Sequence, residues 1–289
     1  MSSENPDLSS LAKSRSPAVA LIVSDIANPF FAEIIPAIEE RLGLDGFVVF
    51  VGNSSEDRQR EERLLAKIRE FPPDGILICP ALGEVESSFG TPALAGRLPM
   101  VAFARRAPGL DYAGIDNAQG AQLAVEHFYQ VGYHRIAFVG GNPNSSAVQE
   151  RVEGYQKALT RSGLQFDPLL VIPSAPTRGG GYDSVRKLLQ IEDRPNAALC
   201  FNDLVALGAI EALKLAGVKV GSDFGVIGFN DVSTETQPAL TTIDTAPRQL
   251  GEVAAELLLR RIKKPDSLRQ TTILHPRLIV RESCGTFIQ

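Results

Sequence analysis

Short runs of consecutive apolar residues recur along the chain and alternate with longer amphipathic segments. Uninterrupted apolar character is what a strand buried on both faces requires. The runs predict strands at Ala18–Val23, Phe47–Val51, Gly75–Cys79, Met100–Phe103, Arg135–Val139, Leu169–Ile172, Ala197–Phe201 and Phe224–Phe229. The segments between them predict helices at Phe30–Leu42, Glu56–Phe71, Ala118–Val131, Gln149–Ser162 and Leu204–Ala216. This alternation is typical of the α/β class, in which helices flank a parallel sheet.

The strand–helix units are too numerous for one doubly wound domain, so we expect two Rossmann-like lobes with a ligand cleft between them. A new strand follows a long helix near residue 134. A late helix at Arg248–Ile262 and a β-type run at Arg277–Val280 suggest that the chain crosses between the lobes more than once. We expect an N-terminal lobe of 18–133 plus about 241–264, and a C-terminal lobe of 134–240 plus about 270–289.

Composition and charge favour a globular protein whose partner is a small molecule or another protein. The chain of 289 residues is 44% hydrophobic, and its net charge of −5 lacks the basic surface of a free-standing nucleic-acid binder. It shows no secretion signal, and no apolar run approaches the roughly 18 residues that span a membrane. These features predict a cytoplasmic protein without membrane contact. Residues 1–17 lack apolar periodicity, and we expect them to form a tail.

The sequence contains no recognisable catalytic, metal or nucleotide motif. Cys79, Cys200 and Cys284 are widely separated and form no CxxC, which argues against a disulfide framework and a zinc site. GxSxG, HExxH, a Cys–His pairing, GxGxxG and GxxxxGK[ST] are all absent. We therefore expect no enzyme activity, no cofactor and no metal ion.

Ligands of open α/β sheets bind beyond the carboxyl ends of the strands, so the residues that follow each predicted strand are the candidates. Asp25 and Asn28 follow the first strand, and Asn28 suits a helix N-cap. Phe30 and Phe31 are adjacent on the helix and should not both face the core. We expect one of them at the cleft, where it could stack on a sugar or a base; the alternative is that both line the packing of the lobe.

Later strands are followed by polar candidates of the C-terminal lobe. Ser145 precedes a helix whose N-terminus could hold an anion, and Arg151 could fork two hydroxyls or a carboxylate. The bland alternative for Arg151 is a surface ion pair with an adjacent glutamate. Asn202 and Asn230 each follow a strand and each precede an aspartate, and together they predict a convergent polar patch. Asp203 is explained by helix capping alone.

These strand ends lie within segments that resemble a known family. The segments are Ala20–Phe31 (ALIVSDIANPFF), Gly114–Ala137, Glu150–Ala158, Phe201–Gly208 (FNDLVALG), Val226–Asp231 (VIGFND), Leu240–Ala254 and Pro276–Ser283. In order and spacing they resemble the lactose/galactose repressor (LacI/GalR) family of transcriptional regulators. Seven ordered blocks over residues 18–283 make the resemblance specific.

The resemblance implies two lobes joined by three crossovers, as in periplasmic sugar-binding proteins. It implies ligand contacts from Arg151, Asn202 and the Asn230 position, with Phe30 stacking on the ligand; Asp25, Arg105 and Ser145 complete the candidate set. It further implies a homodimer and a small-molecule effector that changes the orientation of the lobes. A sugar, sugar phosphate or sugar acid is favoured over a purine.

The family also implies control of operator DNA through an N-terminal helix-turn-helix head. We expect that head to be absent from this chain, because residues 8–16 resemble the end of the hinge segment that precedes the core. Operator DNA is then a partner only through the head.

Two residues depart from the family pattern. Ala104 precedes Arg105 where the family usually has an acid, and Asn230 stands where an acid usually begins the pair. Both changes remove negative charge near the cleft, which favours an anionic ligand such as a sugar phosphate or a sugar acid.

Two other functions are compatible with a two-lobe α/β fold. A solute-binding protein of a sugar transporter shares the architecture, but it would carry a secretion signal. An enzyme working in the cleft would need a base–nucleophile pair, which the sequence does not show. The sensor of a transcriptional regulator is therefore the favoured hypothesis.

Overall fold

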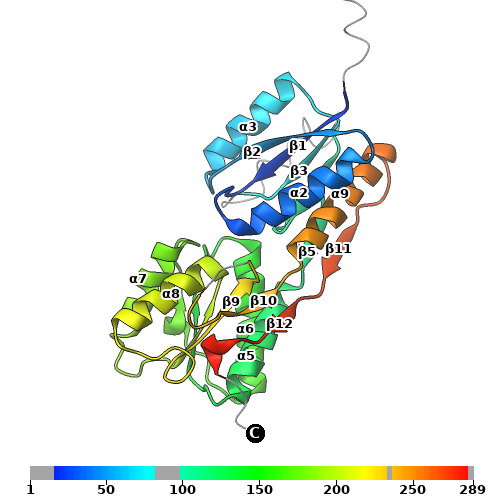
Figure 1. Ribbon diagram of the computed structural model, residues 1–289. Coiled ribbons are helices and arrows are strands. Elements are labelled where there is room, and N and C mark those ends of the chain that lie inside the picture. Colours follow the sequence, from blue (N-terminus) through cyan, green and yellow to red (C-terminus); the bar gives the residue numbers. More distant parts are fainter. Residues whose placement is uncertain (1–15, 82–97, 233–235, 286–289) are drawn as a thin grey trace, which may run out of the picture.

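The protein consists of two α/β lobes, each built on a six-stranded sheet (Figure 1). The computed structural model describes residues 16–81, 98–232 and 236–285. The tail expected over residues 1–17 therefore lies outside the described residues, apart from its last two. Two lobes with flanked, largely parallel sheets confirm the fold class that the sequence predicts.

The sheet of the N-terminal lobe has the strand order β11-β5-β4-β3-β1-β2, and every pair in it is parallel. Its strands are β1 (Ala18–Val23), β2 (Val48–Asn53), β3 (Gly75–Ile78), β4 (Met100–Phe103), β5 (Asp111–Ile115) and β11 (Thr271–Leu274). Its helices are α2 (Pro29–Gly43), α3 (Arg58–Glu70) and α9 (Pro247–Lys263). Helices α2 and α9 lie side by side, and both contribute to one apolar core with β1, β3 and β4 (Figure 1).

The sheet of the C-terminal lobe has the strand order β12-β10-β9-β8-β6-β7. Its strands are β6 (Ile136–Val139), β7 (Val171–Ile172), β8 (Ala197–Cys200), β9 (Gly225–Asn230), β10 (Thr241–Asp244) and β12 (Arg277–Ile279). Its helices are α5 (Asn117–Gln130), α6 (Ser146–Arg161), α7 (Arg178–Leu188) and α8 (Asp203–Leu215), with short 3-10 turns at Pro168–Leu170 and Glu282–Cys284. Only β12 runs antiparallel to its neighbour among the described pairs.

The chain passes between the two lobes three times in the part that the structure describes. It leaves β5 for α5, leaves β10 for α9 and leaves β11 for β12. Each passage takes only a few residues, and the last one spans just His275 and Pro276. The lobes are thus connected by three short crossover segments, as the family resemblance implied.

The strand pairing differs from the expected lobe boundaries at three places. Helix α5, expected in the N-terminal lobe, packs with α6 in the core of the C-terminal lobe. Strand β10 pairs with β9 of the C-terminal lobe, and β11 pairs with β5 of the N-terminal lobe, the reverse of the expectation. Gly154 explains the close fit of α5, because a Cβ there would lie 2.2 Å from the carbonyl oxygen of Ala118. Sequence periodicity reports that a helix is amphipathic but not which sheet it covers.

The edge strand β2 differs from the other predicted strands in its burial. Its apolar run predicted burial on both faces, yet Val48, Phe50 and Val51 are 47%, 64% and 43% exposed. Strand β1, its neighbour, is buried along its full length. Val48, Phe50 and Val51 therefore form an uncovered apolar strip along this edge of the single chain, with Val48 and Phe50 on one face of the sheet and Val51 on the other.

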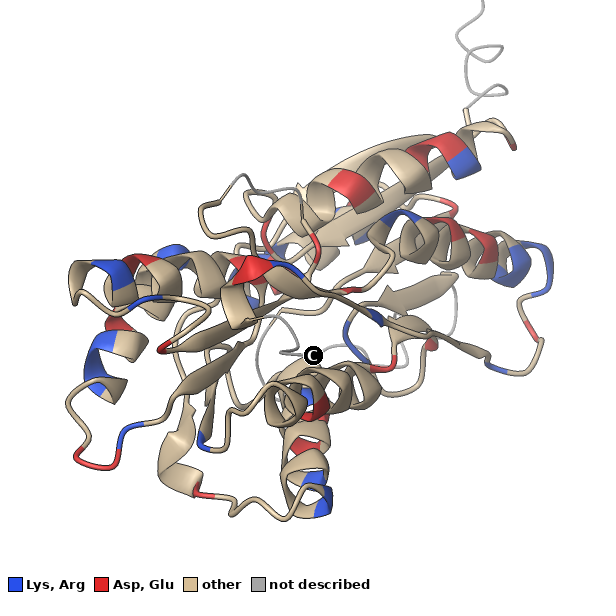
Figure 2. Cartoon of the chain, turned by 60° about the horizontal axis from the view of Figure 1, so that its bottom comes forward, with Lys and Arg blue, Asp and Glu red and all other residues tan. Residues whose placement is uncertain are grey.

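Charged side chains lie mainly on the helices and loops that surround the sheets. Figure 2 shows Lys and Arg interspersed with Asp and Glu on both lobes. No helix among the described residues has the length and apolar character needed to cross a membrane.

Candidate functional site

A narrow cavity of about 50 Å³ lies between the lobes, beyond the carboxyl ends of strands from both sheets. Six of the seven candidate residues line it, three from each lobe: Asp25, Phe30, Arg105, Arg151, Asn202 and Asn230. Typical ligand pockets hold roughly 300–1,000 Å³, so a sugar ring enters this site only if the lobes or the side chains move apart. Candidates up to 205 positions apart in the sequence thus line one cavity, and their contacts with a ligand stay a prediction.

The expectation that Phe30 and Phe31 do not both face the core is wrong, whereas the expected position of one of them at the cleft is found for both. Their exposed fractions are 6% and 3%, and both rings line the cavity. The ring centroids lie 5.2 Å apart in an edge-to-face arrangement, and Phe31 also packs against Phe103. Val232 of the C-terminal lobe belongs to the same apolar cluster. The first turn of α2 is thus covered by both lobes, so adjacent positions of the helix are buried at once.

Arg151 is a buried cation that forms no ion pair with any described acidic residue. Its Nε donates to Asn117 Oδ1 at 2.9 Å, and its Nη1 donates to the carbonyl of Phe201. The guanidinium carbon lies 4.7 Å from the ring centroid of Phe201 and 3.5 Å from that of Phe229. Burial lowers the pKa of Arg151 to about 9, so the group is still charged at neutral pH. Its Nη2 has no protein acceptor among the described residues and is free for a ligand.

The neighbouring glutamate does not neutralise Arg151. The Glu150 carboxylate instead accepts from Arg106 Nε at 2.6 Å and from Asn117 Nδ2 at 2.8 Å. The alternative of a surface ion pair between Arg151 and an adjacent glutamate is therefore wrong.

The N-cap of α8 is Asn202 and not Asp203, whose capping role the sequence suggested. Asn202 is the N-cap of α8, because its Oδ1 accepts from the N–H of Val205 at 2.8 Å, while its Nδ2 donates to the carbonyl of Pro176. Asp203 accepts instead from the hydroxyl of Thr242 at 2.6 Å and from the N–H of Val232 at 2.9 Å. Burial raises the pKa of Asp203 to about 7, although both donors oppose the rise. Asn202 keeps one amide hydrogen for a ligand.

Asn230 ends β9 in an unusual backbone conformation. Its φ is 112°, and the φ of Asp231 is 52°, a region that L-residues rarely adopt. Asn230 is 6% exposed, and its Oδ1 has no hydrogen-bond partner. Arg281 donates to Asp231 Oδ1 at 2.8 Å and holds the turn. Asn230 lines the cavity and therefore adds a buried acceptor without a described partner to its wall.

Two candidates contribute less than expected. Ser145 is the N-cap of α6, but its Oγ makes no capping bond and the residue is not among those that line the cavity. Asp25 lines the cavity and uses one carboxylate oxygen to accept from the N–H of Ala27 at 3.0 Å. Its second oxygen has no partner in the described part of the chain.

Glu56 is a residue of the site that sequence reasoning missed. It lines the cavity and forms a bidentate ion pair with Arg105, with both N–O distances 2.7 Å. Burial opposes the charge of Arg105, but the acidic groups beside it hold the pKa of Arg105 above its usual value. Glu56 follows the end of β2, so the strand-end argument would have found it had it been applied to that strand.

The structure contradicts the absence of a Cys–His pairing. His127 Nε2 lies 3.1 Å from Cys284 Sγ, although the two residues are 157 positions apart in the sequence. Both side chains are buried. Burial raises the pKa of the Cys284 thiol to about 11 and lowers the pKa of His127. The pair is therefore neutral and does not resemble an activated nucleophile.

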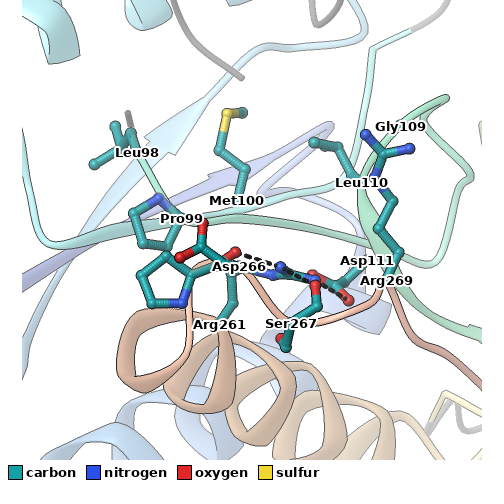
Figure 3. A pocket seen from close by; sticks show the side chains of 11 residues that line it. Leu98, Pro99, Met100, Gly109, Leu110, Asp111, Arg261, Asp266, Ser267 and Arg269 are labelled. Carbon is teal, nitrogen blue, oxygen red and sulfur yellow. Dashed lines mark hydrogen bonds and ion pairs between the residues drawn. The ribbon is translucent and has the colours of Figure 1, made fainter. Parts of the chain in front are cut away.

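A larger cavity of about 420 Å³ lies on the N-terminal lobe, at the amino ends of β4 and β5 (Figure 3). Its wall contains Asp111 and Arg261, whose bidentate ion pair has N–O distances of 2.7 and 3.0 Å. Arg261 also donates to the carbonyls of Pro265 and Ser267, so its hydrogen-bonding groups are occupied. We favour the interlobe cavity as the site, because it has unused polar groups and lies at the carboxyl ends of the strands. The described residues contain no group of three or more side chains that could hold a metal ion.

Comparison with known proteins identifies the family of the chain. The profile of a periplasmic binding protein-like domain matches residues 125–284. The HTH-type transcriptional repressor PurR of Aliivibrio salmonicida is 31% identical over 273 residues, which cover 92% of this chain and 80% of the repressor. A LacI family transcriptional regulator from Enterococcus faecalis V583, solved with bound ribose, is 29% identical, has a TM-score of 0.82 and covers 93% of this chain and 98% of its own. The chain belongs to the LacI family of transcriptional regulators.

Another solved relative shares the architecture of this LacI-family core. The transcriptional regulator CelR in complex with cellobiose is 27% identical, with a TM-score of 0.82 over 96% of this chain and 88% of its own. LacI-family regulators are transcription factors, which confirms the expectation that the chain is not an enzyme.

Proposed function

We propose that this LacI-family core binds a small polar effector, a sugar or a sugar derivative, in the cavity between its lobes. The cavity takes half of its candidate residues from each lobe, and this observation carries the proposal. A ligand that contacts both walls binds one relative orientation of the lobes better than another, so it shifts the equilibrium between them. Effector binding thereby controls operator binding by an N-terminal helix-turn-helix head. This role agrees with the cytoplasmic location expected from the sequence.

The unused polar groups of the cavity favour a ligand with hydroxyl groups. Arg151 Nη2 is a free donor and Asn230 Oδ1 is a free acceptor, and a hydroxyl can satisfy both kinds. Phe30, Phe31 and Phe201 supply the apolar faces on which a sugar ring packs. The related regulators solved with ribose and with cellobiose support this class of effector.

The uncovered apolar strip of β2 supports the proposal of a homodimer. Val48, Phe50 and Val51 are exposed on an edge strand, where neighbouring backbone groups also lack a partner strand. Burying such a strip against a second copy removes apolar area from water, at about 25 cal/mol per Å².

A thermal-shift screen of the chain against sugars, sugar phosphates, sugar acids, nucleosides and purine bases tests the proposal. A specific ligand at 100 times its Kd stabilises the fold by about 2.7 kcal/mol. We expect Arg151→Gln to abolish the shift, because it removes the free donor from the C-terminal-lobe wall. Arg161→Gln is the matched control: Arg161 lies on the same helix, its side chain is 57% exposed, and it pairs with Glu126 outside the cavity.

Two outcomes of the screen would contradict the proposal. Equal ligand affinity in Arg151→Gln and wild type would place the site elsewhere. The absence of any ligand across the library would reject a sugar-type effector.

A further inference from the structure

The N-terminal-lobe wall of the cavity contains a bidentate ion pair between the Glu56 carboxylate and the Arg105 guanidinium. Glu56 Oε1 and Oε2 each accept from one terminal nitrogen of Arg105 at 2.7 Å. Both residues line the cavity, and their side chains are only 20% and 12% exposed. Parallel bidentate pairing of this kind has a fixed geometry and leaves little of the guanidinium free for another anion.

The backbone holds Glu56 in place at some conformational cost. Ser55 and Glu56 have φ values of 54° and 57°, in the left-handed region that favours glycine. The N–H of Glu56 donates to the carbonyl of Ser24 at 2.7 Å, and Asn53 Oδ1 accepts from the N–H of Ser55 at 3.2 Å. These bonds tie the turn after β2 to the end of β1, so the Glu56 carboxylate is directed at Arg105.

Arg105 is fixed on its other side as well. Its Nη1 donates to the carbonyl of Pro80 at 3.0 Å, while the N–H of Ala81 donates to Glu61 Oε2 at 2.6 Å. The carbonyl of Pro80 and the N–H of Ala81 belong to one peptide unit, which is therefore held from both ends. Arg105 cannot turn towards a ligand without breaking the bond to Pro80 as well as the pair with Glu56.

The two walls of the cavity consequently differ in charge. On the N-terminal-lobe wall, Glu56 offsets Arg105 and replaces the acid that the family pattern places at Ala104, and Asp25 adds a second carboxylate. On the C-terminal-lobe wall, Arg151 is a cation with no carboxylate partner among the described residues. From the sequence, we expected the cleft to have lost negative charge at Ala104. Glu56, which lies on another loop, supplies that charge.

We propose that Glu56 is a selectivity residue of the cavity: its carboxylate cancels the charge of Arg105 and excludes anionic groups from the N-terminal-lobe wall. The outward lone pairs of the carboxylate accept hydroxyl hydrogens from the neutral part of a ligand, and a negatively charged or carbonyl group of the ligand is directed to Arg151. This inference rests on the proposed role of the cavity as the effector site.

Inorganic phosphate is the probe for this selectivity, because its binding does not depend on the identity of the effector. Isothermal titration calorimetry at pH 7.5 and constant ionic strength compares wild type with Glu56→Gln, which keeps the shape of the side chain and removes its charge. We expect the variant to bind phosphate on the order of tenfold more tightly, because the positive charge of Arg105 is no longer offset by a carboxylate. In the double variant Glu56→Gln/Arg105→Gln the gain should disappear.

Glu62→Gln is the matched control, since Glu62 pairs with Arg58 on the outside of α3 with a side chain that is 51% exposed. Its phosphate affinity should equal that of wild type. Glu56→Gly provides a second test should the glutamine variant fail to fold, because a φ of 57° suits glycine.

If the Glu56 carboxylate only stabilised the loop, removing it would change the stability of the protein but not its affinity for phosphate. The proposal is overturned if neither Glu56→Gln nor Glu56→Gly binds phosphate more tightly than wild type, or if the gain persists in the double variant. A phosphate gain together with an effector library that yields no ligand would instead reject the proposed function and leave the charge role of Glu56 intact.

Discussion

Burial changes the acid–base behaviour of several side chains near the ends of the strands. Glu61 is 2% exposed and accepts one hydrogen bond, from Ala81, while Asp203 is 1% exposed and accepts from Thr242 and Val232. Burial raises the pKa of Glu61 to about 7 and that of Asp203 to a similar value. The folded protein therefore retains protons that the unfolded chain releases near pH 4.

Glu61→Gln should make the protein less sensitive to pH. Between about pH 4.5 and 7 the unfolded state loses the Glu61 proton and the folded state keeps it, so the free energy of unfolding of wild type falls as pH rises. The free energy of unfolding of Glu61→Gln, relative to that of wild type, should rise by about 3 kcal/mol over this pH range. Above pH 7 this difference should stay constant. Urea unfolding at several pH values measures the difference. Glu62→Gln removes a carboxylate from an exposed neighbouring position of the same helix and serves as the control.

The sequence predicted that residues following the strands would lie together, and Asp25, Asn202 and Asn230 do line one cavity. Arg151 and Phe30 reach the same cavity from helices α6 and α2, and the ligand contacts of all five stay a prediction. What could not be predicted depends on distant partners, because neither the ion pair between Glu56 and Arg105 nor the burial of Phe31 by the other lobe is encoded locally.

Among the elements, those with uninterrupted apolar runs were predicted closely, such as β1 and α2. Strands β5 and β11 were missed, because Asp111 begins the first and two threonines begin the second. Helix α7 was missed because three glycines follow its first residue, Arg178, and glycine lowers helix propensity. One of these glycines is needed for packing: a Cβ at Gly181 would lie 2.0 Å from the carbonyl oxygen of Val205 in α8.

Gly154→Ala tests whether α5 belongs to the C-terminal lobe. The added methyl group would lie 2.2 Å from the carbonyl oxygen of Ala118, so α5 and α6 must separate. We expect the free energy of unfolding to fall by about 1–3 kcal/mol, measured by chemical denaturation. Gly43→Ala at the end of α2 meets no atom within 4 Å and should be neutral or slightly stabilising. Equal stability of the two variants would contradict the close packing of α5 on α6.

At the scale of the whole molecule, the uncovered strip of β2 is the feature that the single chain does not explain. Phe50 is 64% exposed at an edge where β2 has no second neighbour in the described sheet. The two lobes each bury their own core, so this strip is not needed for the fold of one copy.

Phe50→Lys should weaken the proposed homodimer. Placing a charge in a buried apolar contact raises the dissociation constant by about tenfold or more. Sedimentation velocity over a range of concentrations measures the change. Leu215→Lys is the control, because Leu215 is 73% exposed at the end of α8 in the other lobe. A monomeric wild type, or a dimer unaffected by Phe50→Lys, would remove this strip from the interface.

The last segment of the chain has a consequence for how the protein is made. Strand β11 at residues 271–274 completes the edge of one sheet, and β12 at residues 277–279 completes the edge of the other. Because β11 and β12 follow one another along the chain, both sheets are completed by the same short stretch of synthesis, after α9 has been made. A frameshift or stop codon shortly after residue 263 would therefore leave two unfinished sheets, each with an exposed edge that invites aggregation.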